Sequence, residues 1–171
     1  GDRVVFPTGQ TPMGLYEHIR RNNTPFLKVF QLDEYYNSTE YRDYLAAQLP
    51  KHYEFHFIDS SESRCEEELK IHDALCQNLD LIILGIGHNG HIAFNEPPSN
   101  EMSVTRIVRL DQNTIDANAT QYTMAITLGI RTILTAKKIV LMANKNKQHI
   151  LDQIFAGKAT PASALAHHPN V

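Results

Sequence analysis

The stretch that decides the fold is LDLIILGIGHNGHIAFNEP, residues 79–97. It begins with an almost unbroken apolar run, residues 79–84, and passes directly into a loop with three glycines, two histidines, two asparagines and one glutamate. A continuous rather than alternating apolar run is typical of a parallel strand that is covered on both faces. We therefore predict a buried strand whose carboxyl end opens into a loop crowded with polar and titratable groups.

The rest of the chain repeats this pattern of short apolar runs separated by helical segments. Three further buried strands are predicted at residues 4–6, 27–32 and 139–143. Helices are predicted at residues 11–21, 41–49, 63–76, 124–136 and 147–155. Two more stretches are candidates for strands, residues 54–58 and 105–110. Strands that alternate with helices indicate an α/β fold with a doubly wound, mostly parallel sheet and helices on both faces.

The composition narrows the class of protein. With 171 residues, 42% of them hydrophobic and 20% charged, the chain can bury a core as one domain. A formal net charge of −3 argues against nucleic acid or an anionic membrane as a partner. No apolar stretch reaches the roughly 20 residues of a membrane span, and the N-terminus runs into the first strand without a leader peptide.

The two cysteines indicate a reducing compartment. Cys65 and Cys76 fall in one predicted helix, where eleven positions correspond to about 16 Å of rise. A disulfide needs Cα atoms within about 7 Å of each other. We therefore expect free thiols that pack in the core, and a cytoplasmic protein.

Ligands of such sheets bind at the carboxyl ends of the strands, so the loops that follow the strands are the place to look for a site. PTGQTP, residues 7–12, offers backbone N–H groups, hydroxyls and a glycine before a helix, which suits a phosphate. The alternative is an ordinary turn with Thr11 as the helix N-cap. DEYY, residues 33–36, offers a carboxylate that can act as a base, and we favour Asp33, at the strand end, over Glu34. The alternative for this motif is a solvated loop acid.

The central loop holds groups suited to proton transfer. Histidine is the side-chain type that titrates near neutrality without assistance, and Glu96 can fix the tautomer of His91 as the third member of a catalytic triad does. The alternative that His88 and His91 bind a metal is disfavoured, because no cysteine or acidic cluster completes the ligand set. After the last strand, NKNK offers Lys147 as a point charge for a phosphate, with solvated surface as the alternative.

Four motifs in order along the chain resemble one enzyme family. PTGQTP, LDEYY, GIGHNGHIAFNEP and TPASALAHHPN are similar to segments of the glucosamine-6-phosphate deaminases, a family that includes galactosamine-6-phosphate deaminase/isomerases. The resemblance spans nearly the whole chain, and its central motif is highly specific. It implies a Rossmann-like α/β fold and an aldose–ketose isomerisation coupled to loss of ammonia, from glucosamine 6-phosphate to fructose 6-phosphate. It implies no cofactor, no metal and an association into homo-oligomers.

The resemblance also assigns roles by motif. His91 would move a proton at the ring oxygen to open the sugar, and Glu96 would orient His91. Asp33 would take the proton from C2 and return it at C1. Asn89, where family members have Asp or Asn, would bind substrate or support the loop. Contacts with the substrate and its phosphate are implied for Thr8, Gly9, Gln10, Thr11, Gly87 and Lys147.

Several features of the family are not found in this sequence. The expected strand and helix before VVFPTG are absent, and IDANA runs into TQYTMAITLGI without the expected arginine-bearing lid. Ser99 and Arg106 match part of an allosteric site of some members, but Val108 stands where a basic residue would help.

Two other functions compete with the deaminase assignment. The 6-phosphogluconolactonases share the fold, but AFNEP departs from their Ser–Leu–Phe–Pro pattern. A sugar-phosphate sensor without catalysis would be expected to carry a helix-turn-helix. The sequence does not identify which hexosamine 6-phosphate epimer is the substrate.

Overall fold

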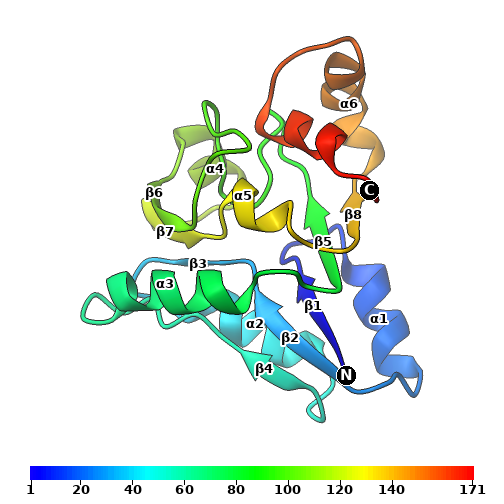
Figure 1. Ribbon diagram of the computed structural model, residues 1–171, viewed down its shortest axis with the longest axis vertical. Coiled ribbons are helices and arrows are strands. Elements are labelled where there is room, and N and C mark those ends of the chain that lie inside the picture. The colour runs from blue at the N-terminus through cyan, green and yellow to red at the C-terminus, as the bar shows by residue number, and fades with distance from the viewer.

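The structure, a computed structural model that describes residues 1–171, is built on a five-stranded parallel sheet (Figure 1). The strand order is β4-β2-β1-β5-β8. The strands are β1 (Asp2–Phe6), β2 (Leu27–Gln31), β4 (Glu54–His56), β5 (Leu81–Gly85) and β8 (Ile139–Met142). All four pairings in this sheet are parallel, with Phe6 level with Gln31 and Gly85 level with Met142.

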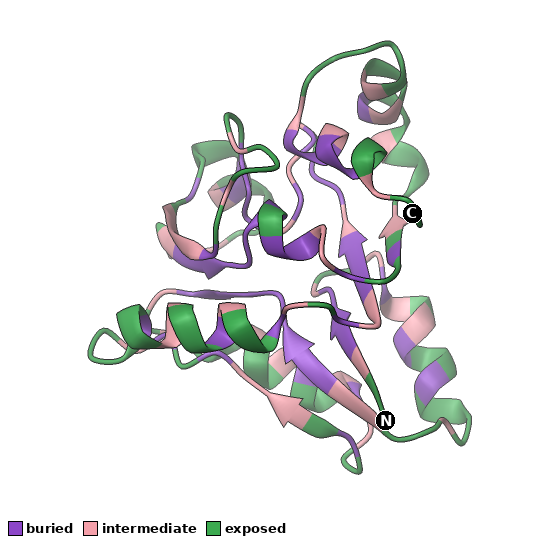
Figure 2. Ribbon diagram, viewed as in Figure 1, coloured by how far each residue is buried: buried purple, intermediate pink, exposed green.

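Helices cover both faces of the sheet, as predicted. The longer helices are α1 (Met13–Arg21), α2 (Glu40–Gln48), α3 (Cys65–Leu75) and α6 (Gln148–Phe155). The shorter ones are α4 (Gln112–Ala117), α5 (Ile130–Ile133), and the 3₁₀ segments η1 (Lys145–Lys147) and η2 (Pro161–His167). Successive side chains of β1 enter different cores, because Val4 and Phe6 pack with α1 residues while Val5 packs in the larger cluster on the other face. Figure 2 shows β1, β2 and β5 largely buried, β4 and β6 mostly of intermediate exposure, and the helices exposed along their outer sides. None of the helices combines the length and apolar character needed to cross a membrane.

A second sheet overturns two predictions. It is antiparallel, with the order β3-β7-β6, and consists of β3 (Asp33–Tyr35), β7 (Met124–Thr127) and β6 (Arg106–Arg109). The predicted helix at residues 124–136 is therefore wrong, since its first part is β7 and only the single turn of α5 is helical. The motif at residues 33–36 is mostly strand rather than loop.

The physical reason lies in pairing and in one glycine. A short apolar run does not distinguish a strand from a buried helix, and β7 gains partners on both sides from β3 and β6. Gly129 then separates β7 from α5. Only glycine fits at this position, because a Cβ there would lie 2.2 Å from the backbone carbon of Val104.

The other predicted elements are found with small shifts of their ends. The strands predicted at residues 27–32 and 79–84 are β2 and β5, and the two candidate strands are β4 and β6. The helices predicted at residues 41–49, 63–76 and 147–155 are α2, α3 and α6. Cys65 and Cys76 are free and buried, as expected.

The strand order contains a reversal that locates the site. From β1 the chain builds outward through β2 and β4, whereas β5 and β8 extend the other edge. The loops that leave β1 and β5 therefore diverge between two adjacent strands. Such a switch point is where open α/β sheets bind their ligands.

Candidate active site

The loop after β5 folds into a tight turn around its glycines. The Gly87 N–H donates to the His91 carbonyl at 2.9 Å, and the Gly90 N–H donates to the Gly87 carbonyl at 3.1 Å. Gly90 has φ of +80°, which disfavours other residues, and a Cβ there would lie 2.5 Å from Thr160. The turn therefore brings His91 back beside Gly87 and lets the C-terminal segment pack against the loop.

His91, Asn89 and Glu96 form one hydrogen-bonded group. His91 Nδ1 lies 2.8 Å from Asn89 Oδ1 and 3.2 Å from Glu96 Oε2. The Asn89 amide donates to Glu96 Oε2 at 2.7 Å, and the His91 backbone N–H donates to Asn89 Oδ1 at 3.1 Å. Both oxygens that face Nδ1 are acceptors, so Nδ1 carries the proton and Nε2 is left free to accept one. The predicted pairing of Glu96 with His91 is present, and Asn89 bridges the two residues.

Glu96 is kept ionised by its surroundings. The side chain is 9% exposed, and burial acts to raise its pKa. The hydrogen bonds and charge of His91, with hydrogen bonds from Thr114 and Asn89, outweigh burial and hold the pKa below its ordinary value. An ionised Glu96 fixes the orientation and tautomer of the His91 imidazole.

Gly87 has a positioning role that the sequence does not reveal. A Cβ on Gly87 would lie 2.0 Å from His91 Cε1 and 2.2 Å from His91 Nδ1. The imidazole therefore packs directly over the backbone of residue 87, and only glycine permits this. The predicted contact of Gly87 with substrate stays a prediction.

The antiparallel sheet holds the turn that carries Glu96. Buried Asn95 donates to the carbonyls of Ile92 and Leu128 at 3.1 and 2.9 Å. Thr127 of β7 accepts a hydrogen bond from the Phe94 N–H at 3.1 Å, and Thr127 is paired with Asp33 of β3. The second sheet thus connects the turn of Glu96 to the strand of Asp33.

Asp33 lies where β2 passes into β3, and its carboxylate is 6% exposed. It accepts no hydrogen bond from the rest of the chain. Burial, assisted by the negative charge of Glu34, raises the pKa of Asp33 to about 8. Its neighbour Tyr41 lies near both Asp33 and Thr8. An unpartnered, buried carboxyl with a pKa near neutrality suits a general acid–base residue.

Burial raises the pKa of Glu34 as it does that of Asp33, but the two carboxylates differ in their hydrogen bonding. It is completely buried and accepts hydrogen bonds from the backbone N–H groups of Tyr35, Tyr41 and Arg42 and from the side chain of Gln31. Two of those N–H groups belong to the first turn of α2, so Glu34 caps that helix from a neighbouring strand. The preference for Asp33 over Glu34 as the available carboxylate agrees with this geometry.

The turn after β1 has free donors. None of the backbone N–H groups of Thr8, Gly9, Gln10 and Thr11 donates a hydrogen bond within the chain. Gly9 has φ of +89°, and its carbonyl accepts from Tyr44 at 2.6 Å. The alternative of Thr11 as the helix N-cap is wrong, because α1 begins at Met13 without a side-chain cap.

Lys147 lies in the loop after β8, close to that turn. Asn144 of the same loop donates to Thr11 Oγ1 at 3.2 Å. Lys147 is half-buried, its amine makes no ion pair or hydrogen bond within the chain, and burial lowers its pKa. A desolvated cation without a counter-charge is favourable only where an anion can join it.

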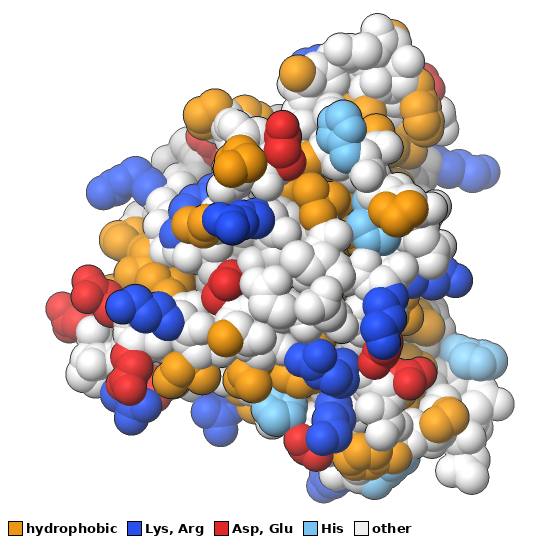
Figure 3. Space-filling view, viewed as in Figure 1, with side chains coloured by type: hydrophobic (Ala, Val, Ile, Leu, Met, Phe, Trp, Pro, Cys, Tyr) orange, Lys and Arg blue, Asp and Glu red, His pale blue; other side chains and the backbone are white.

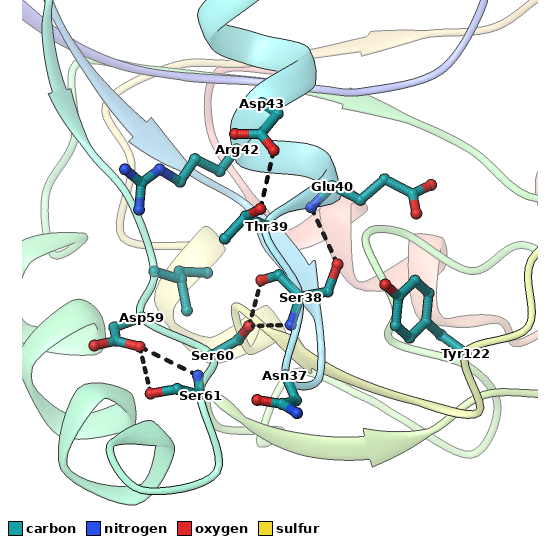
Figure 4. A pocket seen from close by; sticks show the side chains of 11 residues that line it. Asn37, Ser38, Thr39, Glu40, Arg42, Asp43, Asp59, Ser60, Ser61 and Tyr122 are labelled. Atoms are coloured by element: carbon teal, nitrogen blue, oxygen red, sulfur yellow. Dashed lines mark hydrogen bonds between the residues drawn. The ribbon is translucent and has the colours of Figure 1, made fainter.

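Two pockets on the molecule are lined by other residues, although the second borders the central loop through Pro97 and Thr160. One, of about 460 Å³, lies between the first turn of α2 and the segment before α3 (Figure 4). Arg42, at its edge, stacks over the ring of Phe57. The other, of about 530 Å³, lies between residues 97–101 and 159–167. In the first pocket the Ser60 hydroxyl donates to the Ser38 carbonyl, and the Ser38 hydroxyl accepts from the Glu40 N–H. Thr39 donates to Asp43, and Ser61 donates to Asp59. Because these groups are already paired, we place the site at the strand ends.

Two further observations concern ligands. No three His, Cys, Asp and Glu side chains are grouped closely enough to hold a metal ion. Positive and negative side chains are interspersed over the face shown in Figure 3, which presents no single-sign patch.

The sequence reasoning missed three residues that shape the site: Thr114, Asn95 and Asn144. Thr114 comes from α4, and no motif marks it. Asn95 lies within the central motif, but only the structure shows that it holds the turn. Asn144 lies in NKNK, where the lysines drew attention instead.

Comparisons with known proteins identify the family of the chain. Residues 3–171 match the family model of glucosamine-6-phosphate isomerases/6-phosphogluconolactonase. A glucosamine-6-phosphate deaminase from Lachnoclostridium phytofermentans is 37% identical over 194 residues, covering 96% of this chain and 82% of the relative. One from Clostridium acetobutylicum is 36% identical over 191 residues, covering 94% and 79%.

Solved structures share the fold. A monomeric glucosamine-6-phosphate deaminase has a TM-score of 0.90 at 30% identity, with 99% of this chain and 83% of that chain covered. A 6-phosphogluconolactonase from Trypanosoma brucei has a TM-score of 0.76 at 16% identity, covering 98% of this chain and 80% of that chain, and shows likeness of fold alone. The expectation of a homo-oligomer is not tested by a neighbour that is itself monomeric. The family match over nearly all residues, together with these relatives, establishes that the chain belongs to the family of glucosamine-6-phosphate isomerases and 6-phosphogluconolactonases.

Proposed function

We propose that this protein converts glucosamine 6-phosphate and water to fructose 6-phosphate and ammonia. The observation that carries the proposal is the unpartnered Asp33 carboxyl on the same sheet edge as the His91–Asn89–Glu96 group. An aldose–ketose isomerisation needs one base that moves a proton between adjacent carbons and one group that moves a proton at the ring oxygen. Relatives named as glucosamine-6-phosphate deaminases support the choice of substrate.

The proposed sequence starts with ring opening. His91 Nε2, free to accept a proton, takes the proton of the C1 hydroxyl and delivers one to the ring oxygen, which breaks the C1–O5 bond. Glu96 stabilises the imidazolium that forms in between. The product is the open-chain aldehyde with the amine on C2.

Asp33 then carries out the isomerisation. Its carboxylate removes the C2 proton, and the electron pair forms a C1=C2 enolamine as the C1 oxygen gains a proton. Return of the proton from Asp33 to C1 leaves a protonated imine at C2. Water adds to that carbon, and ammonia leaves as the C2 ketone forms. Atoms balance without a redox step or a cofactor.

The phosphate would be bound by the turn of Thr8, Gly9, Gln10 and Thr11 and by Lys147. The four free N–H groups and the unpaired amine support this part of the proposal. Gly87 would let the sugar approach the backbone. Energy from the non-reacting phosphate would hold C1 and C2 in place for proton transfer.

The test is an assay of ammonia and ketose phosphate release from purified protein with glucosamine 6-phosphate and with galactosamine 6-phosphate. We expect turnover of the glucosamine epimer and at least about a 10²-fold loss in the Asp33→Asn variant. Faster turnover of the galactosamine epimer would change the assigned substrate. Hydrolysis of 6-phosphogluconolactone without ammonia release would replace the proposal.

A further inference from the structure

Two histidines stack beside the proposed phosphate site. His88, in the loop after β5, and His149, in the first turn of α6, have ring centroids 5.6 Å apart and planes 23° apart. Both side chains are exposed. His149 Nδ1 lies 3.2 Å from the Asn146 carbonyl, which makes it the donor and leaves Nε2 for another partner. Neither ring is assigned a part in the reaction above.

The charges that act on His88 are all positive, while on α6 Asp152 follows His149 by one helical turn. The groups that act on His88 are Lys147, His149 and His91, and together with burial they lower its pKa, with Lys147 the largest cause. His91 is balanced by Glu96, but the Lys147 amine has no counter-ion in the chain. Three groups that can carry positive charge thus converge without a carboxylate among them. Such an arrangement is unfavourable when empty and favourable around an anion.

The histidine pair lies next to the other groups that are proposed to bind the phosphate. β5 and β8 are paired up to Gly85 and Met142, so the loops that follow them begin side by side. Asn144 joins the second loop to Thr11, within the turn whose N–H groups are free. The histidine pair therefore extends the border of the same cationic region.

We propose that His88 and His149 bind the phosphoryl group of the substrate together with Lys147, in a proton-dependent manner. The identity of the anion as a sugar phosphate rests on the proposed function. Histidine is the side-chain type whose ordinary pKa, about 6.5, puts its change of charge near physiological pH. A dianion beside the stacked rings favours their protonated forms, and binding takes up protons when the free rings are neutral. Affinity for the phosphate then rises as pH falls.

The experiment uses inorganic sulfate, whose charge is constant over the range of interest, so any pH dependence comes from the protein. Sulfate affinity is measured by calorimetry from pH 6 to 8 for the wild type, His88→Asn and His149→Asn, with exposed His52→Asn as the matched control. We expect affinity to fall about tenfold across this range in the wild type and the control, the equivalent of about 1.4 kcal/mol. In the two variants the fall should be about threefold or less. The same slope in all four proteins, or no sulfate binding by the wild type, overturns the proposal.

A second readout separates this proposal from the function. With glucosamine 6-phosphate, His88→Asn should raise KM about threefold to tenfold at pH 6.5 with kcat nearly unchanged. If the protein releases ammonia but the variants keep the wild-type pH dependence of sulfate affinity, the proposed role of the histidine pair is wrong and the proposed function stands. If the variants change the pH dependence of sulfate affinity but no ammonia is released, the proposed function is wrong and the anion site stands.

Discussion

Asn89 donates its side-chain amide to Glu96 across 2.7 Å, and its own amide oxygen accepts from His91. Asn89 therefore links the carboxylate to the imidazole and prevents either side chain from turning away. Removing one contact leaves the other groups free to reorient. The three side chains are expected to act as a unit.

The first prediction concerns that unit. Asn89→Leu keeps the side-chain volume but removes all three hydrogen bonds of the Asn89 side chain, and Glu96→Gln removes the charge. Each single change should lower kcat by about 10- to 100-fold. The double variant should be little less active than the less active of the two single variants, because the effects of residues that act together are not additive. Steady-state kinetics of the four proteins measures the coupling. Multiplication of the two single effects would show that the residues act independently.

The second prediction concerns Asp33 and stability. Its folded pKa of about 8 lies above its ordinary value of 3.8, so the folded state holds a proton that the unfolded state has released. Stability attributable to this group is therefore fully present below pH 4 and is lost as pH rises toward 8. The free energy of unfolding of the wild type should fall, relative to Asp33→Asn, by on the order of a few kcal/mol between these limits, since each pKa unit corresponds to about 1.4 kcal/mol.

Urea unfolding at several pH values tests this prediction, and the difference between the two proteins is the quantity of interest. Asp33→Asn should also lose most turnover at every pH. A constant difference from pH 4 to 8 would mean that Asp33 is ionised in the folded protein throughout, with an ordinary pKa.

A third prediction separates two glycines of one loop. In Gly87→Ala the new methyl group would occupy the space of the His91 ring, at 2.0 Å from Cε1, so the imidazole must move. We expect kcat to fall by about 10²-fold or more, since His91 is the proposed proton-transfer group. Gly85→Ala is the matched control, because nothing lies within 4 Å of its added Cβ. Comparable activity of both variants would contradict the positioning role of Gly87.

The sequence predicts the parallel sheet because its strands are continuous apolar runs with helices between them. Ile82, Ile83 and Leu84 are buried in β5, as a continuous apolar run in a parallel sheet predicts. The strand β7 is not predictable in this way. Met124–Thr127 is apolar and followed by an apolar helical turn, so only its pairing with β3 and β6 determines its conformation.

The site shows the same division. Asp33, His91 and Glu96 follow strands that end at one edge, so their proximity can be inferred from topology. The Thr114 contact with Glu96 joins residues 18 positions apart through α4, and no local pattern specifies it. Gly87 is recognisable as a special position, but its conflict with the imidazole requires the three-dimensional turn.

The last prediction concerns Glu34, whose structural role cannot be recognised from the sequence. All four groups around its carboxylate are donors, three backbone N–H groups and the Gln31 amide. Glu34→Gln turns one acceptor into a further donor and leaves buried N–H groups without partners. The loss in unfolding free energy should be about 2–4 kcal/mol, at roughly 1–3 kcal/mol for each unsatisfied group. Glu40 is exposed on α2, the helix that Glu34 caps. Glu40→Gln is the control and should change the free energy of unfolding by less than about 0.5 kcal/mol.

Glu34→Gln also separates a structural role from an electrostatic one. The negative charge of Glu34 is the second cause, after burial, of the raised pKa of Asp33. Asp33 acts as a base only when ionised, so the activity of the wild type should rise as pH increases through about 8. Removing the neighbouring charge lowers the pKa of Asp33, and the rise should move to lower pH. The pH dependence of kcat/KM, measured at a temperature where both proteins stay folded, decides the matter. A destabilised variant whose activity rises at the wild-type pH would leave Glu34 as a helix cap without influence on the proton transfer.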